Sequence, residues 1–108
     1  MDLVSKTCVP CRGGILPLTL AEAEKYLPQV PGWNLIDDAT KIERTFKFDN
    51  FVAAMNFAQK VGELAEFEGH HPVVTFGWGY CRVLFYTTKI NGLHENDFII
   101  AAKVNTLV

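Results

Sequence analysis

The feature that most constrains the fold is an amphipathic segment in the middle of the chain, residues 51–68. Asp49 or Asn50 can cap its start, and Gly69 can end it in a left-handed conformation. Pro72 prevents helical hydrogen bonding from resuming beyond it. The segment therefore predicts one long helix with one face against a core. Its apolar residues at helical spacing are Phe51, Ala54, Met55, Ala58, Val61, Leu64 and Ala65.

Two pairs of strands flank this helix. Before it, the segments 33–37 and 41–48 are predicted to form a hairpin, and the second of them alternates apolar and polar side chains. After it, the segments 73–78 and 80–88 are predicted to pair about a glycine-rich bend. Arg44 interrupts the apolar face of its strand, which indicates either an edge position or a functional contact.

A short helix is expected at each end of this series. Thr19 and Glu22 have the spacing of a capping box, and the helix they begin must end by Pro28. The acidic residues Glu95 and Asp97 suit the start of a closing helix that runs to Leu107. The order α-β-β-α-β-β-α predicts an α+β two-layer sandwich, with a four-stranded antiparallel sheet and helices on one face. Residues 1–17 are expected to form an irregular N-terminal arm, and residues 18–108 a single domain.

The last strand is apolar on both faces. Val83 and Phe85 lie on one face, and Leu84 and Tyr86 on the other. Because a sheet exposed to water on one side should alternate, and helices are expected on one face only, the other face is predicted to need a partner. A second copy of the chain is the candidate.

Size and charge exclude several classes of protein. The chain has 108 residues, 49% of them hydrophobic, which fits one small globular domain rather than a disordered chain. The net charge of −2 has the wrong sign for steering toward phosphates, so no direct nucleic-acid partner is expected. No apolar run approaches the roughly 20 residues of a membrane span, and no secretion signal is evident. The expected location is therefore cytoplasmic, without membrane association.

The cysteines predict reduced thiols. Cys8, Cys11 and Cys81 are an odd number, which is atypical of a secreted disulfide scaffold. Cys8 and Cys11 have the spacing used by zinc knuckles and redox dithiols, but no second pair accompanies them. A structural or incidental role is the favoured interpretation, with redox chemistry or a metal shared between subunits as the alternative.

The segment from Glu66 to Pro72 carries the strongest chemical signal. His70 and His71 follow the end of the central helix, whose dipole favours imidazolium, and Glu66 can orient a ring if the turn stays helical. These residues form a candidate acid–base site. The alternative is that both histidines only cap the helix and face water. With His94 and distant cysteines they form no familiar zinc pattern, so no metal is expected.

Two further residue groups could contact a ligand. Trp78 and Tyr80 flank glycines and could stack on a flat heterocycle, although aromatic residues in strands more often belong to a core or an interface. Asp97 suits the first turn of the closing helix, with a ligand contact as its second role.

In combination these residues resemble a known family. Glu66, the triplet His70-His71-Pro72, Trp78 and Asp97 are similar to the signature of the pterin-4a-carbinolamine dehydratases, also called dimerisation cofactors. The resemblance extends over most of the chain. One position departs from the pattern, because Thr88 stands where the family usually has a histidine or a tryptophan. A threonine hydroxyl can bind a ligand but does not titrate near neutral pH.

The resemblance implies a hydro-lyase. Its substrate would be 4a-hydroxytetrahydropterin, its product quinonoid dihydropterin, and its role the recycling of tetrahydropterin after aromatic amino acid hydroxylation. It implies no metal or organic cofactor, a homodimer or tetramer, and a functional link to an aromatic amino acid hydroxylase. Because of Thr88, a catalytically weak pterin-binding or partner-binding oligomer is the alternative.

The resemblance also assigns roles to individual residues. His71 would be the principal acid–base group, and His70 the second, contacting or protonating the departing hydroxyl. Glu66 would orient a ring and Pro72 would shape the pocket. The substrate-binding residues would be Glu66, His70, His71, Pro72, Trp78, Thr87, Thr88, Lys89, Ile90 and Asp97.

Overall fold

The computed structural model describes residues 2–9 and 13–108. Its helices are α1 (Leu20–Tyr26), α2 (Phe51–Glu68) and α3 (Glu95–Asn105), and its strands are β1 (Asn34–Ile36), β2 (Lys41–Lys47), β3 (Val73–Gly77) and β4 (Tyr80–Phe85). Three 3-10 turns are η1 (Leu3–Ser5), η2 (Leu27–Gln29) and η3 (Thr88–Ile90). The predicted α+β architecture and its element order are confirmed. None of the helices in these described ranges is long and apolar enough to cross a membrane.

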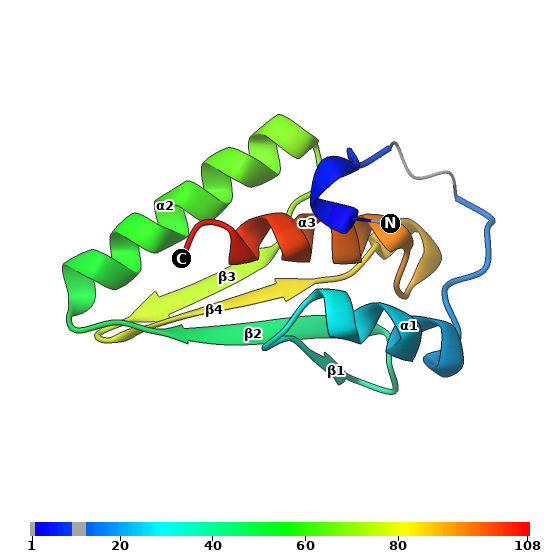
Figure 1. Ribbon diagram of the computed structural model, residues 1–108, viewed down its shortest axis with the longest axis horizontal. Helices are drawn as coiled ribbons and strands as arrows, with labels where there is room; N and C mark the ends of the chain where they lie inside the picture. Colours follow the sequence, from blue (N-terminus) through cyan, green and yellow to red (C-terminus); the bar gives the residue numbers. More distant parts are fainter. Residues whose placement is uncertain (1, 10–12) are drawn as a thin grey trace.

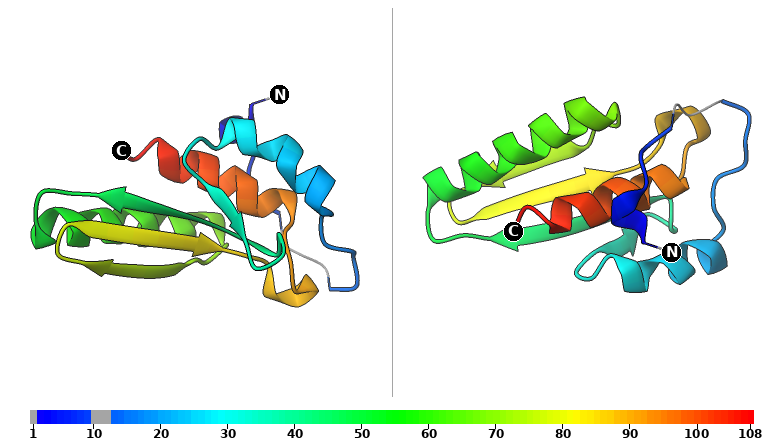
Figure 2. Two further views of the ribbon diagram at one scale, coloured as in Figure 1. Left: turned by 90° about the horizontal axis from the view of Figure 1, so that it is seen from below. Right: turned by 45° about the horizontal axis from the view of Figure 1, so that its top comes forward.

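The sheet has four antiparallel strands in the order β1-β2-β4-β3. The long helices α2 and α3 lie on one face of it (Figure 1), and α3 lies between α2 and α1 (Figure 2). In the two central strands, Ile42 is paired with Phe85 and Phe46 with Cys81, and all four side chains are buried beneath the helices. The core therefore fills the space between this sheet face and the helix layer.

The central helix begins and ends where its capping residues predict. The side chain of Asn50 accepts a hydrogen bond from the backbone of Ala53, and Gly69 adopts the left-handed conformation at φ 68° with its N–H bonded to Ala65. The buried residues of α2 are Ala54, Phe57, Val61 and Ala65, whereas Phe51 and Met55 remain over 40% exposed. The buried stripe is thus rotated relative to the predicted one, because Phe57 packs against the aromatic rings of Phe46 and Phe48.

The last strand is shorter than predicted. β4 ends at Phe85, and residues 88–90 form the turn η3 instead of continuing the strand to Thr88. Thr87 and Gly92 pair with each other through two backbone hydrogen bonds of 2.9 and 3.4 Å, which reverse the chain direction. Asn91 takes the left-handed conformation that this tight reversal requires, at φ 51°.

Arg44 is not on an edge strand, because β2 lies between β1 and β4. Its guanidinium donates hydrogen bonds to Asn105 Oδ1 at 2.7 Å and to the carbonyl oxygen of Pro31 at 3.1 Å. It also lies 4.3 Å above the ring centroid of Phe46. Arg44 therefore ties the sheet to the end of α3 and to the turn before β1, which explains the polar residue on an apolar face.

Replacement of Asn105 should reveal the strength of this connection. The Asn105 amide accepts from the indole N–H of Trp33 at 2.8 Å and donates to Pro31 at 3.0 Å. Asn105→Ala should lower the free energy of unfolding by about 2 kcal/mol, because the buried indole loses its acceptor. Urea unfolding followed by tryptophan fluorescence measures this. The matched change Asn34→Ala, at an exposed strand position, should stay within about 0.5 kcal/mol of wild type. Equal losses in the two variants would contradict the assigned role.

Candidate active site

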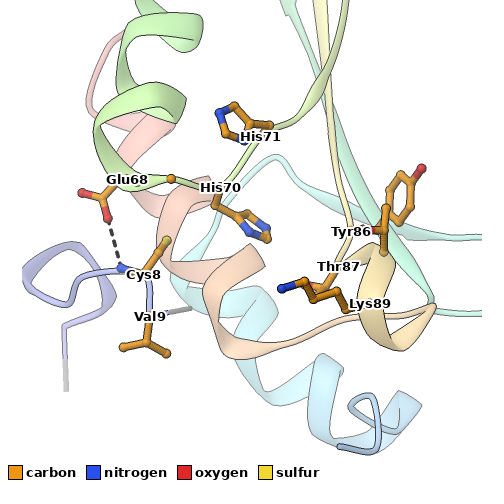
Figure 3. A pocket seen from close by; sticks show the side chains of 10 residues that line it. Cys8, Val9, Glu68, His70, His71, Tyr86, Thr87 and Lys89 are labelled. Carbon is orange, nitrogen blue, oxygen red and sulfur yellow. Dashed lines mark hydrogen bonds between the residues drawn. The ribbon is translucent and has the colours of Figure 1, made fainter. Parts of the chain in front are cut away.

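A pocket opens where the end of α2, the segment after β4 and the N-terminal arm meet (Figure 3). Its volume is about 590 Å³, which is in the range of small-molecule sites. The lining residues are Cys8, Val9, Glu68, Gly69, His70, His71, Tyr86, Thr87, Thr88 and Lys89. The two adjacent histidines thus reach one cavity, together with three further predicted substrate-binding residues, Thr87, Thr88 and Lys89.

Behind the pocket lies the carboxylate of Asp97, which is fully buried. One oxygen, Oδ1, is 2.6 Å from Nε2 of His70. The other, Oδ2, accepts from the hydroxyl of Thr87 at 2.8 Å and from the backbone N–H of His94 at 3.0 Å. The last of these bonds belongs to a capping box at the start of α3, where the helix dipole also favours negative charge. Three segments of the chain therefore meet at one carboxylate.

The ring of His70 is fixed by two contacts. Because the Asp97 carboxylate accepts, Nε2 of His70 carries the proton of their shared hydrogen bond. One face of the ring stacks on buried Phe85, with ring centroids 5.9 Å apart and planes inclined by 19°. The side chain is only 13% exposed. These contacts leave Nδ1 as the ring atom available to a ligand.

His71 has a different environment. The left-handed turn at Gly69 redirects the chain, and the side chain of His71 is 61% exposed. Its Nε2 is hydrogen-bonded to Glu66 Oε2. Glu66 is four residues before His70 and would lie next to its ring only if the helical turn continued past Gly69. Since α2 ends at Glu68, that turn does not continue, and Glu66 pairs with His71 instead.

The opposite wall is formed by residues 86–89 (Figure 3). Thr87 is buried and held by Asp97, whereas Thr88 and Lys89 are exposed side chains at the cavity. The ammonium of Lys41 lies 4.9 Å above the ring centroid of Tyr86. The wall thus combines an aromatic ring, two hydroxyl groups and a lysine.

Five lining residues are not predicted by any sequence pattern: Cys8, Val9, Glu68, Gly69 and Tyr86. No local pattern could place Cys8 there, because its contact with Glu68 joins residues 60 positions apart. Burial, reinforced by the Glu68 carboxylate, raises the pKa of the Cys8 thiol from 9.0 to about 12. The thiol is therefore protonated and weakly nucleophilic at neutral pH. Cys11, its predicted partner in a Cys-x-x-Cys pair, lies outside the described residues.

Other predicted site residues lie away from the cavity lining. Trp78 is 72% exposed in the turn at the far end of β3, and Ile90 is buried within η3. Pro72 directly follows His71, and Asp97 reaches the cavity through His70. In the part of the chain that the structure describes, no three His, Cys, Asp or Glu side chains converge as a metal site would require.

Comparisons with known proteins agree on one family. The family model described as pterin 4 alpha carbinolamine dehydratase matches residues 16–107. A putative pterin-4-alpha-carbinolamine dehydratase of Methylococcus capsulatus is 66% identical over 106 residues, covering 98% of this chain and 93% of the relative. A relative of the same description from Aromatoleum aromaticum is 58% identical, covering 98% and 95%.

Two solved structures have the same fold. A transcriptional coactivator/pterin dehydratase from Brucella melitensis superposes with a TM-score of 0.78 at 32% identity, covering 84% of this chain and 97% of that one. A pterin dehydratase-like protein identified as a RuBisCO assembly factor gives a TM-score of 0.61 at 21% identity, covering 73% and 92%. The second similarity concerns the fold alone.

The lowered pKa of Glu68 predicts that the folded protein loses stability in acid. Burial acts to raise its pKa, but hydrogen bonds from the backbone of Cys8 and the ammonium of Lys103 outweigh it, so the pKa lies below the ordinary 4.5. Because the folded state lowers this pKa, Glu68 contributes stability above pH 4.5 that is lost as the pH falls through the folded-state value. As the pH falls from about 6 to 3, the free energy of unfolding should therefore decrease less in Glu68→Gln than in the wild-type protein, because glutamine does not titrate. Urea titrations at each pH test this. Parallel pH curves for the two proteins would contradict it.

Proposed function

The chain belongs to the pterin 4 alpha carbinolamine dehydratase family, and we propose that it is an active hydro-lyase that converts 4a-hydroxytetrahydropterin to quinonoid dihydropterin. The observation that carries this proposal is the convergence of two histidines on one pocket, with His70 held by the buried carboxylate of Asp97. Such a carboxylate–imidazole pair fixes the ring orientation and the tautomer of a general acid or base.

The reaction needs one proton given and one proton taken. The bond between C4a and the hydroxyl oxygen breaks, and the oxygen leaves as water after accepting a proton. The proton on N5 is removed, and its electron pair forms the C4a–N5 double bond. Imidazole suits both transfers because its ordinary pKa is near neutral pH. The proposal therefore requires no metal or organic cofactor.

The two histidines have environments that suit different roles. We assign the solvent-exposed His71 as the principal acid–base group, since its ring can exchange protons with water. Glu66 orients this ring. His70 presents Nδ1 to the departing hydroxyl, and Asp97 holds it in that orientation. A separate two-electron reductase would then reduce the quinonoid product to tetrahydropterin, and this recycling links the protein functionally to an aromatic amino acid hydroxylase.

Thr88 favours a second candidate function. This residue lines the pocket where the family usually has a histidine or tryptophan, and its hydroxyl cannot serve as a neutral-pH acid or base. One general acid or base contributes about 10²–10⁴-fold to a rate, so the lack of a third group slows the reaction without abolishing it. A protein with little remaining activity would function as a pterin-binding or partner-binding module.

We further propose a homodimer, or a tetramer of two dimers, formed through β3. This strand is at the edge of the sheet, and such edges can pair with another chain. Val73 and Phe76 on the strand are 51% and 39% exposed, and Phe76 contacts the exposed ring of Phe51 on α2. Apolar surface therefore continues from the open strand onto the neighbouring helix, as a subunit interface requires.

Kinetics of two variants test the catalytic proposal. The wild-type protein should accelerate decay of the carbinolamine produced by a hydroxylase, and His71→Ala should remove most of that acceleration. Asp97→Asn should lower kcat by about 10²-fold, because an amide facing Nε2 no longer enforces the same His70 tautomer. The matched control Asp49→Asn, at an exposed aspartate before α2, should retain wild-type kinetics. Wild-type decay no faster than that in buffer would contradict the dehydratase proposal and favour the binding module.

Light scattering tests the assembly. The wild-type mass should be two or four times the 12.1 kDa of one chain, and Phe76→Lys should reduce it, because a charge at the strand edge opposes pairing. Leu16→Lys places the same charge at a side chain that is 90% exposed elsewhere, and should leave the mass unchanged. A wild-type mass of 12.1 kDa would contradict the proposal.

A further inference from the structure

Residues 3–9 of the N-terminal arm are held along α3, although sequence patterns indicate no regular structure there. Leu3 is buried in the core, with 2% of its surface exposed. Lys6 forms an ion pair with Glu95 at 2.8 Å, in the first turn of α3. Figure 2 shows this first segment lying across α3. The arm is therefore part of the packed structure up to the edge of the pocket.

Asn96 fixes the next part of the arm. Its side chain is fully enclosed, with 1% exposed, and it pairs with the backbone of Val9 at two points. The Val9 N–H donates to Asn96 Oδ1 at 3.0 Å, and Asn96 Nδ2 donates to the Val9 carbonyl at 2.6 Å. Asn96 directly precedes Asp97, so adjacent residues of α3 hold Val9 and His70.

Cys8 is held by both long helices. Its backbone N–H donates to Glu68 Oε1 at 3.0 Å, and the other oxygen of Glu68 accepts from Lys103 on α3 at 2.7 Å. The Glu68 side chain is only 3% exposed, so this connection is shielded from water. The thiol of Cys8 donates to the carbonyl oxygen of Asn96 at 3.6 Å.

This anchoring leaves the side chain of Val9 exposed. Both backbone groups of Val9 are bonded to a buried amide, yet 54% of the residue remains exposed, and it lines the pocket beside Cys8. In Figure 3 these two residues lie across the cavity from Tyr86 and Lys89. A rigid backbone that presents an apolar side chain to a cavity is preorganised for ligand contact, because little conformational entropy is lost on binding.

We infer that Cys8 and Val9 form a third wall of the substrate site that contacts a bound reduced pterin, and that Asn96 is the residue that positions this wall. The inference rests on the proposed function, because that function identifies the ligand as a reduced pterin. Among the described residues, no hydrogen bond joins Cys8 or Val9 to the ring of His70 or His71. It therefore strengthens binding of substrate and transition state equally, and its loss raises KM while kcat is retained.

Steady-state kinetics test the wall with matched controls. Val9→Ala and Asn96→Ala should each raise KM about five-fold and change kcat by less than about two-fold. Val4→Ala removes an exposed valine in η1, outside the pocket, and should keep the wild-type KM. Asn105→Ala removes a structural amide from the same helix as Asn96 and should lower stability without changing KM.

Alkylation of Cys8 locates the ligand independently of turnover. In a Cys11→Ser background, Cys8 and the fully buried Cys81 are the remaining thiols. Because the Cys8 thiol is protonated at neutral pH, maleimide labels it slowly and the reaction is followed over hours. Saturating 7,8-dihydropterin, which lacks the reactive hydroxyl, should slow this labelling about five-fold further, since the ligand covers the wall. Asn96→Ala should speed labelling without ligand, because it releases the arm. Mass spectrometry assigns the labelled residue.

The outcomes separate this inference from the proposed function. Normal wild-type turnover with unchanged KM in Val9→Ala and Asn96→Ala, and unprotected Cys8, would overturn the wall while the dehydratase stands. A wild-type protein without turnover whose Cys8 is nevertheless protected by dihydropterin would support the wall and contradict catalysis. Absence of both turnover and protection would overturn both. If Asn96→Ala does not fold, Val9→Ala and the protection measurement decide alone.

Discussion

The site depends on the hydrogen bonds that three segments of the chain make to the buried carboxylate of Asp97. A charge removed from water is tolerated only when hydrogen bonds replace its hydration. Asp97 obtains them from the backbone at the start of α3, from Thr87 after β4 and from the ring of His70 after α2. Because all three donors must converge on Asp97, the relative positions of these segments are fixed. The hydrogen bond to the carboxylate also holds the imidazole of His70 in place.

The pocket combines a rigid side and an exposed side. His70 is held by Asp97 and Phe85, whereas His71 lies near the surface with Glu66. The adjacent residues therefore have different surroundings: one ring is held in direction by its contacts, and the other is open to solvent. The left-handed turn at Gly69 ends α2, so both rings lie beyond the helix, where one meets Asp97 and the other meets Glu66.

Sequence patterns predicted much of this molecule. The end of α2 at Gly69 and the element order followed from caps and periodicity, and the family assignment is confirmed. The patterns were wrong where two local rules competed. The apolar run of β4 indicated a strand to Thr88, but the backbone pairing of Thr87 with Gly92 ends it earlier. Glu66 could orient His70 only on a continued helical turn; α2 ends at Glu68, and Glu66 is bonded to His71.

The sequence by itself determined the helices, the strands and which residues carry titratable groups. Helices and strands follow from patterns of neighbours within about four positions along the chain. Tertiary structure alone decided which groups meet. His70 and Asp97 are separated by 27 positions, Cys8 and Glu68 by 60, and Val9 and Asn96 by 87. Contacts over such separations form only when packing of the helix layer on the sheet brings the segments together. Sequence periodicity does not predict that packing, so only the tertiary structure shows that Cys8 and Val9 lie at the site.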